Sequence, residues 1–163
     1  MITAVLNRMI AYNGTDTRRV AHALKVFAFA QALSGDMEPR ARRTLLLAAI
    51  LHDIGIHNAE RKYQSSAGPY QELEGPPVAR EILAAEGAPP ETVERACFLI
   101  GHHHSYAAVD GEDFQILIEA DFLVNIDEER LPTDAIRHIR DRYFKTAAGR
   151  AALTALYGPL NAE

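Results

Sequence analysis

The sequence predicts an all-α protein built as a helical bundle. Apolar residues recur at helical spacing through most of the 163-residue chain. No stretch sustains the alternation of apolar and polar residues that is typical of a half-buried strand. Proline and glycine fall between the periodic segments, at positions where they start and end helices. We therefore expect a strand content near zero.

The first half of the chain contains the clearest helix signals. Asp16 is a suitable N-cap for a long helix, and Gly35 is a suitable stop after it. Pro39 fits the first turn of the next helix, whose segment 45–51 is apolar on every side and is therefore expected in the core. After a short third helix, turn-forming residues predict a loop over residues 64–70. We expect helices at residues 16–33, 40–53 and 58–63.

Prolines and an acidic residue mark the later helices. The proline pairs 76–77 and 89–90 each open a helix, and residues 105–111 read as a loop. Asp113 is a suitable cap for the helix that follows, and Pro132 opens another. The helices expected in this half cover residues 76–87, 89–102, 113–124, 132–144 and 147–157.

The length and composition suit one soluble domain over residues 1–163, with 48% hydrophobic and 24% charged residues. A net charge of −5 argues against non-specific nucleic-acid binding. The single cysteine, Cys97, excludes an internal disulfide framework and a multi-cysteine zinc site. No apolar run approaches the roughly 18 residues of a membrane span, and no positive charge leads the N-terminus as in a signal peptide. We expect a cytoplasmic protein that does not bind membranes.

Four polar residues stand in otherwise apolar helical segments. His22 lies on an apolar face of the first long helix, His52 and Asp53 end the most apolar helix, and Asp121 lies on the apolar stripe of 116–124. Burying an ionised carboxylate costs several kcal/mol unless a cation or hydrogen-bond donors offset it. Taken singly, each has a structural alternative: a core histidine, a solvent-exposed helix end, or an ion pair of Asp121 with an arginine.

Taken together, these residues form the ligand set of a divalent metal. Imidazole and carboxylate suit iron, manganese, zinc, cobalt or nickel, and magnesium is a further candidate. Helices of a bundle can bring such ligands to one point. The consecutive histidines His102, His103 and His104 end another helix, and two of the three could face the same site.

The pattern His22, His52-Asp53 and Asp121 resembles the H…HD…D signature of the HD-domain superfamily of metal-dependent phosphohydrolases. The flanking segments 19–26, 51–55 and 119–123 also resemble the family, and the motif-bearing core covers about residues 16–130. The resemblance implies an all-α, HD-type fold and hydrolysis of phosphomonoesters, phosphodiesters or nucleotides. The helices at 132–157 would pack on this core or on a second copy, which leaves a homodimer open.

The resemblance also implies roles for individual residues. His22, His52, Asp53 and Asp121 would hold a first metal ion, and Asp53 could bridge to a second. In binuclear members one further histidine opens a helix before a small residue, and a consecutive pair comes later. Glu74 looks like the counterpart of the former, which is a departure from the family, and His102 and His103 are the favoured counterparts of the pair, with the frame uncertain by one.

The expected reaction is in-line attack of a metal-activated water on the phosphorus of a small phosphate ester or nucleotide, with Asp53 orienting the water or accepting its proton. The candidate substrate-binding residues are basic or polar residues near the ligands, with ion pairing or solvent exposure as the alternative for each: Arg19, Lys25, Lys62 and Ser65. Two other functions stay open: a metal- or nucleotide-binding module without turnover, and a di-iron oxygenase on the same scaffold.

Overall fold

The all-α prediction is confirmed by the computed structural model, which describes residues 1–160, none of which lies in a strand. The α-helices are α1 (Ile2–Asn13), α2 (Thr17–Leu33), α3 (Pro39–Leu51), α4 (Ile56–Tyr63), α5 (Gly68–Ala85), α6 (Pro90–Ile100), α7 (Glu112–Glu128), α8 (Thr133–Tyr143) and α9 (Ala147–Tyr157), with a 3₁₀ turn at Tyr106–Ala108 before α7. No helix of this described part combines the length and apolarity needed to cross a membrane.

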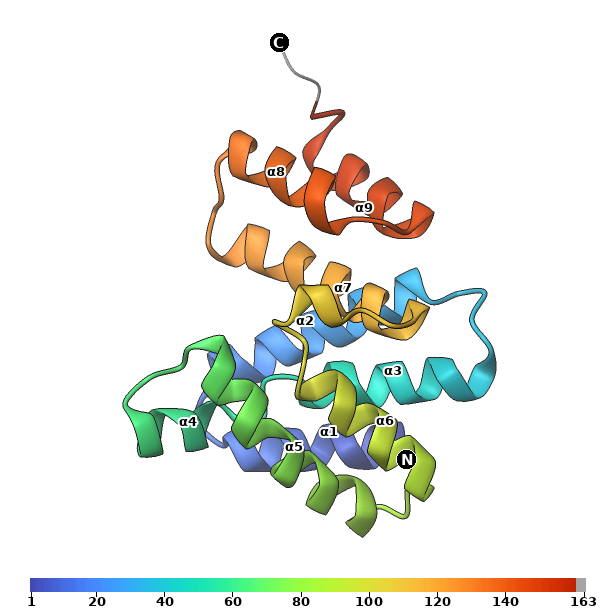
Figure 1. The fold of residues 1–163 in the computed structure, drawn as a ribbon. Helices are drawn as coiled ribbons and strands as arrows, with labels where there is room; N and C mark the ends of the chain where they lie inside the picture. Colours follow the sequence, from blue (N-terminus) through green and yellow to red (C-terminus); the bar gives the residue numbers. More distant parts are fainter. Residues whose placement is uncertain (161–163) are drawn as a thin grey trace.

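Helix α3 occupies the centre of the bundle, as its apolar sequence predicts. All its residues from Thr44 to Leu51 are buried, and it contacts α1, α2, α6 and α7. Figure 1 shows α2 and α7 on one side of α3, with α1, α5 and α6 on the other. The C-terminal end of this helix is therefore surrounded by protein on several sides, and polar residues placed there lie at the meeting point of several helices.

Local signals placed several helix ends correctly. The carboxylate of Asp16 accepts a hydrogen bond from the backbone N–H of Arg19 and so caps α2 as predicted. The last helix, α9, begins and ends at the predicted residues. Asp113 does not cap α7, because its carboxylate pairs with Arg95 of α6 and Gly111 occupies the cap position.

One predicted helix boundary was wrong, and one helix was not predicted. Helix α5 does not begin at Pro76, because it already starts at Gly68 and continues through Pro76 and Pro77. Each interior proline removes one backbone hydrogen bond, but α5 packs along α4 and α6, and this packing holds the helix together. The sequence analysis did not predict α1, whose only buried side chains are Val5 and Met9.

The last two helices are fastened to α7 by a buried carboxylate. Glu119 of α7 is fully buried and accepts hydrogen bonds from the backbone N–H of Lys145 at 2.6 Å and of Thr146 at 2.9 Å, and from the side chains of Thr146 and Gln115. Thr146 is also the N-cap of α9. Figure 1 shows α8 and α9 packed beyond α7, at the far end of the molecule from α1 and α5. The carboxylate of Glu119 thus accepts the backbone hydrogen bonds of the turn that joins α8 to α9.

Replacing Glu119 with alanine is expected to destabilise the protein by about 3 kcal/mol, because buried N–H groups lose their acceptor. For a chain of this size, this lowers Tm by about 6–12 °C. Thermal unfolding followed by circular dichroism measures the change. The control is Glu112→Ala at the exposed start of α7, which should leave Tm within about 2 °C of the wild type. Equal Tm values for the two variants would contradict the assigned role of Glu119.

Candidate metal centre

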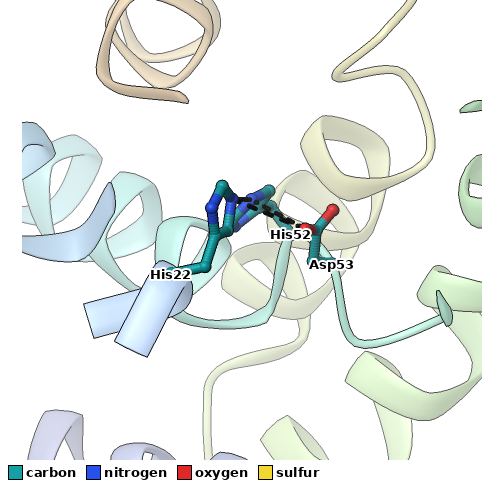
Figure 2. A group of neighbouring side chains, drawn as sticks. All are labelled: His22, His52 and Asp53. Atoms are coloured by element: carbon teal, nitrogen blue, oxygen red, sulfur yellow. Dashed lines mark hydrogen bonds and ion pairs between the residues drawn. The ribbon is translucent and has the colours of Figure 1, made fainter. Parts of the chain in front are cut away.

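Two histidines and an aspartate from α2 and the end of α3 converge at the centre of the bundle. Figure 2 shows the side chains of His22, His52 and Asp53 pointing toward one another. The Nε2 atoms of the two histidines are 3.2 Å apart. Asp53 Oδ2 lies 3.5 Å from Nε2 of His22 and 3.6 Å from Nε2 of His52.

Asp121 of α7 adds a second carboxylate to this group. Its Oδ1 lies 3.3 Å from Nε2 of His22 and 3.6 Å from Nε2 of His52, and its side chain is buried. Ligands bound at about 2.0–2.2 Å in a tetrahedron around zinc lie roughly 3.4 Å from one another. The distances of 3.2–3.6 Å from each carboxylate to the two imidazole nitrogens, and between these nitrogens, match that spacing. His22, His52 and Asp53 therefore form a group that could hold a divalent ion, and Asp121 lies beside the same two nitrogens.

Hydrogen bonds to other groups orient both imidazoles toward the same point. His52 Nδ1 lies 2.9 Å from the carbonyl oxygen of Ala49, to which it must donate, so the neutral ring carries its lone pair on Nε2. His22 Nδ1 lies 3.0 Å from a carboxylate oxygen of Glu128 and donates to it. A carboxylate or carbonyl behind an imidazole is the usual support of a metal-binding histidine.

A second group of possible ligands shares Asp53. Its other oxygen, Oδ1, lies 3.5 Å from His103 Nε2, and His104 lies close enough to both to complete a three-residue group. His103 Nδ1 donates to the carbonyl of Ile100, and its Nε2 is buried without a hydrogen-bond partner among the described residues. Burial and the nearby charge of His103 lower the pKa of His104 to about 4, so its ring is neutral near pH 7. An orphaned buried nitrogen beside a carboxylate fits a second ion.

Without an ion, the first group is held together by charge. Burial opposes ionisation of Asp53, but the nearby charges of His52 and His103 lower its pKa. Burial also disfavours the charged form of His22, but the hydrogen bond with Asp121 and the charge of Asp53 raise the pKa of His22 to about 9. The metal-free site therefore carries a proton on His22 at pH 7, where a bound ion would replace it.

Metal binding is expected to release at least about one proton per ion at pH 7, because His22 must deprotonate before its Nε2 can bind, and, although burial opposes this, Asp53 and Asp121 also raise the pKa of His52. Below pH 9 each fall of one pH unit then lowers the apparent affinity at least about tenfold, as protons compete for these nitrogens. Calorimetric titration of the metal-free protein with Mn²⁺, in buffers of different ionisation enthalpy between pH 6 and 8, measures both effects. An affinity that does not change over this range would contradict a His22 ligand.

The sequence was compared with known proteins. A model of the HD domain matches residues 19–140, which include all four residues of the first group. The chain belongs to the HD-domain family. No curated protein and no solved structure matched the chain. Members of this family are generally metal-dependent hydrolases, and the His and Asp side chains of this HD domain are positioned to hold a metal.

Two ligands expected from the family pattern lie elsewhere in this HD domain. His102 belongs to neither group, since its Nδ1 donates to the carbonyl of Phe98 and its ring stacks on the Phe98 ring. The consecutive histidines that lie with Asp53 in a possible ligand group are His103 and His104, one residue later than the favoured pair. Glu74 is also absent from both groups, because it accepts hydrogen bonds from Lys62 at 2.6 Å and from the hydroxyl of Tyr63.

A cavity of about 430 Å³ opens beside the candidate metal centre, and of the four predicted substrate-binding residues Arg19 lines it, as does Ser66, the neighbour of Ser65. The Arg19 guanidinium already pairs with Asp16 and Glu60, at 3.1 and 2.5 Å. The other three predicted residues do not line this cavity. Lys25 pairs with Glu128 at 3.1 Å, Lys62 pairs with Glu74, and Ser65 accepts a hydrogen bond from the backbone N–H of Ala67.

Several residues that the sequence analysis did not assign to the site also line this cavity, among them Arg18, Gln71, Asn125 and Glu128. Arg18 lies next to Arg19, and Gln71 of α5 places its Oε1 3.2 Å from His104 Nε2. Asn125 donates to Asp121 Oδ1 at 3.0 Å, and Glu128 supports His22. Asn125 and Glu128 follow Asp121 by four and seven residues. This spacing puts all three on one face of α7 and could have revealed them in the sequence.

Proposed function

We propose that the protein is a metal-dependent phosphohydrolase that cleaves a small phosphate ester or nucleotide with one or two divalent ions. The observation that supports this proposal most directly is that oxygens of Asp53 and Asp121 each lie 3.3–3.6 Å from the two imidazole nitrogens of His22 and His52, beside an open cavity. Membership of the HD-domain family supports the same type of chemistry.

The residues of the site divide into those that bind the ion and those that orient the metal-binding side chains. We propose that His22, His52, Asp53 and Asp121 bind the first ion, and that Asp53 with His103 and His104 provides a weaker second site. When bound, the ion would polarise a phosphoryl oxygen and lower the pKa of a water molecule. Gln71, at the second site, offers only a neutral amide oxygen, which is a poorer ligand for a transition metal than an imidazole.

Asp53 has the central part in this proposal. Its two oxygens face the two groups of ligands, so it can fix both relative to the cavity. The lowered pKa of Asp53 keeps it ionised near pH 7, where it accepts a hydrogen bond from the attacking water and orients it. The same lowered pKa makes Asp53 a weak base, which favours orientation of the water over permanent uptake of its proton.

Elemental analysis of protein purified without chelators, followed by assays on a panel of phosphate esters and nucleotides, tests the proposal. We expect at least one bound transition metal per chain and turnover that is lost in His52→Ala. Bound metal and tight nucleotide binding without turnover would instead support the binding module. Iron content with oxygen consumption would support the oxygenase.

A further inference from the structure

The cavity beside the metal centre is strongly polar. Among the described residues that line it, Ile56 is the only aliphatic one, and none is phenylalanine, tyrosine or tryptophan. Small-molecule pockets are normally lined mainly by apolar and aromatic side chains, and stacking on an aromatic ring contributes about 1–3 kcal/mol per nucleobase. Ser66, Gln71 and Asn125 supply hydroxyl and amide groups instead, which hydrogen-bond to hydroxyl groups. The lining favours a hydrophilic ligand without a nucleobase.

Arg18 lines this cavity as a cation that no acidic residue in the described part of the chain neutralises. Within residues 1–160 no carboxylate forms an ion pair or hydrogen bond with its guanidinium, although it lines the cavity together with His22 and Asp53. The neighbouring Arg19 is neutralised by Asp16 and Glu60. Arg18 therefore has its full set of donors available for an anion, and a guanidinium matches the oxygens of phosphate or carboxylate in two-pronged fashion.

The position of Arg18 separates it from the metal ligands. It precedes His22 by four residues on α2, so the two side chains share a helix face and their Cα atoms are about 6 Å apart along the axis. A phosphate bound at the metal centre would contact His22 and Asp53 at the inner end of this face. Arg18, one turn toward the start of α2, would meet a different part of the same ligand.

We infer that the substrate is a hydrophilic, polyhydroxylated phosphate ester with a second anionic group, and that Arg18 binds this second group. The inference rests on the proposed phosphohydrolase function and narrows its substrate class. Arg18 acts as a specificity-determining residue, because it selects among esters without touching the phosphorus that reacts.

The test compares a hexose bisphosphate, the matching hexose monophosphate and a nucleoside monophosphate as substrates of the Mn²⁺-loaded protein. We expect kcat/KM for the bisphosphate to exceed that for the monophosphate about tenfold, the size of one charge-assisted contact. The nucleoside monophosphate should be the poorest of the three. Arg18→Ala should remove the preference for the bisphosphate, mainly by raising its KM, and Arg18→Lys should keep part of it.

The matched control is Arg43→Ala, which removes an exposed arginine that lines a different hollow, beside Gly35 and Pro39. This substitution should leave kcat/KM unchanged for all three substrates. A nucleoside monophosphate that is hydrolysed better than both hexose phosphates would overturn the inference. An Arg18→Ala variant that loses equal activity on the hexose bisphosphate and the hexose monophosphate would also overturn it.

If none of the substrates is turned over, the proposed phosphohydrolase function is contradicted. Calorimetric binding of the two hexose phosphates would then test separately whether Arg18 binds the second anionic group. Tighter binding of the bisphosphate that depends on Arg18 supports the inference. Equal affinities overturn it.

Discussion

Asp53→Asn is expected to remove bound metal and hydrolytic turnover together, while the fold survives. Asparagine keeps the shape of the side chain but loses the negative charge, and it offers only one oxygen where both carboxylate oxygens face possible ligand groups. Loss of a supporting residue behind a metal ligand already costs about 10–100-fold in affinity, so loss of this shared ligand should cost at least about 100-fold. We expect kcat/KM to fall at least about 1000-fold, a loss of about 4 kcal/mol of transition-state stabilisation.

Metal content by elemental analysis and Mn²⁺ affinity by calorimetry measure this effect, and circular dichroism confirms that the helices remain. The matched control is Asp134→Asn, at the exposed start of α8, which should bind metal like the wild type. A variant at position 53 that binds Mn²⁺ with unchanged affinity would show that Asp53 is not a ligand.

Gly55→Ala is expected to destabilise the protein by at least about 3 kcal/mol and to lower Tm by about 6–12 °C. A Cβ at Gly55 would overlap the backbone nitrogen of Gly75 and lie 2.8 Å from the backbone oxygen of Gln71. These are backbone atoms of α5, so no side-chain rotation can relieve the clash. The helix would have to move away from the turn that follows Asp53, and Gln71 would move with it.

Thermal unfolding measures the loss of stability, and calorimetry should detect weaker binding of the second metal ion. Gly35→Ala serves as the control, because a Cβ at Gly35 would meet no atom within 4 Å. Its Tm should stay equal to or slightly above that of the wild type, since alanine restricts the unfolded chain more than glycine does. A Gly55→Ala variant as stable as Gly35→Ala would contradict the close contact between α5 and the turn.

The first group of ligands was predictable because each member disturbs a local pattern. His22 and Asp121 interrupt apolar helix faces, and His52 and Asp53 end a helix that is otherwise apolar all round. A buried polar residue needs a partner, and four such residues with matching chemistry predict one another. The structure places Asp53 and Asp121 each within 3.6 Å of the two histidine nitrogens.

The second group was placed less accurately because it lies at helix ends. Helix α6 ends at Ile100, so the directions of His102, His103 and His104 follow from turn geometry and not from helical periodicity. Glu74 was chosen because it precedes the small residue Gly75 as in the family pattern, and Gln71, three residues earlier in α5, was not considered. With the helix starting at Gly68, Gln71 faces the site and Glu74 faces Lys62.

The sequence by itself determined the all-α fold, the central position of α3 and the identity of the first four possible ligands. These follow from periodicity and from the cost of burying charge, which act over one or two helical turns. Only the tertiary structure decided which histidines face Asp53, that Glu128 supports His22, and that Arg18 has no acidic partner within residues 1–160 whereas Arg19 pairs with Asp16 and Glu60. Those outcomes depend on which side chains from distant helices come within a few ångströms, and local sequence does not encode such distances.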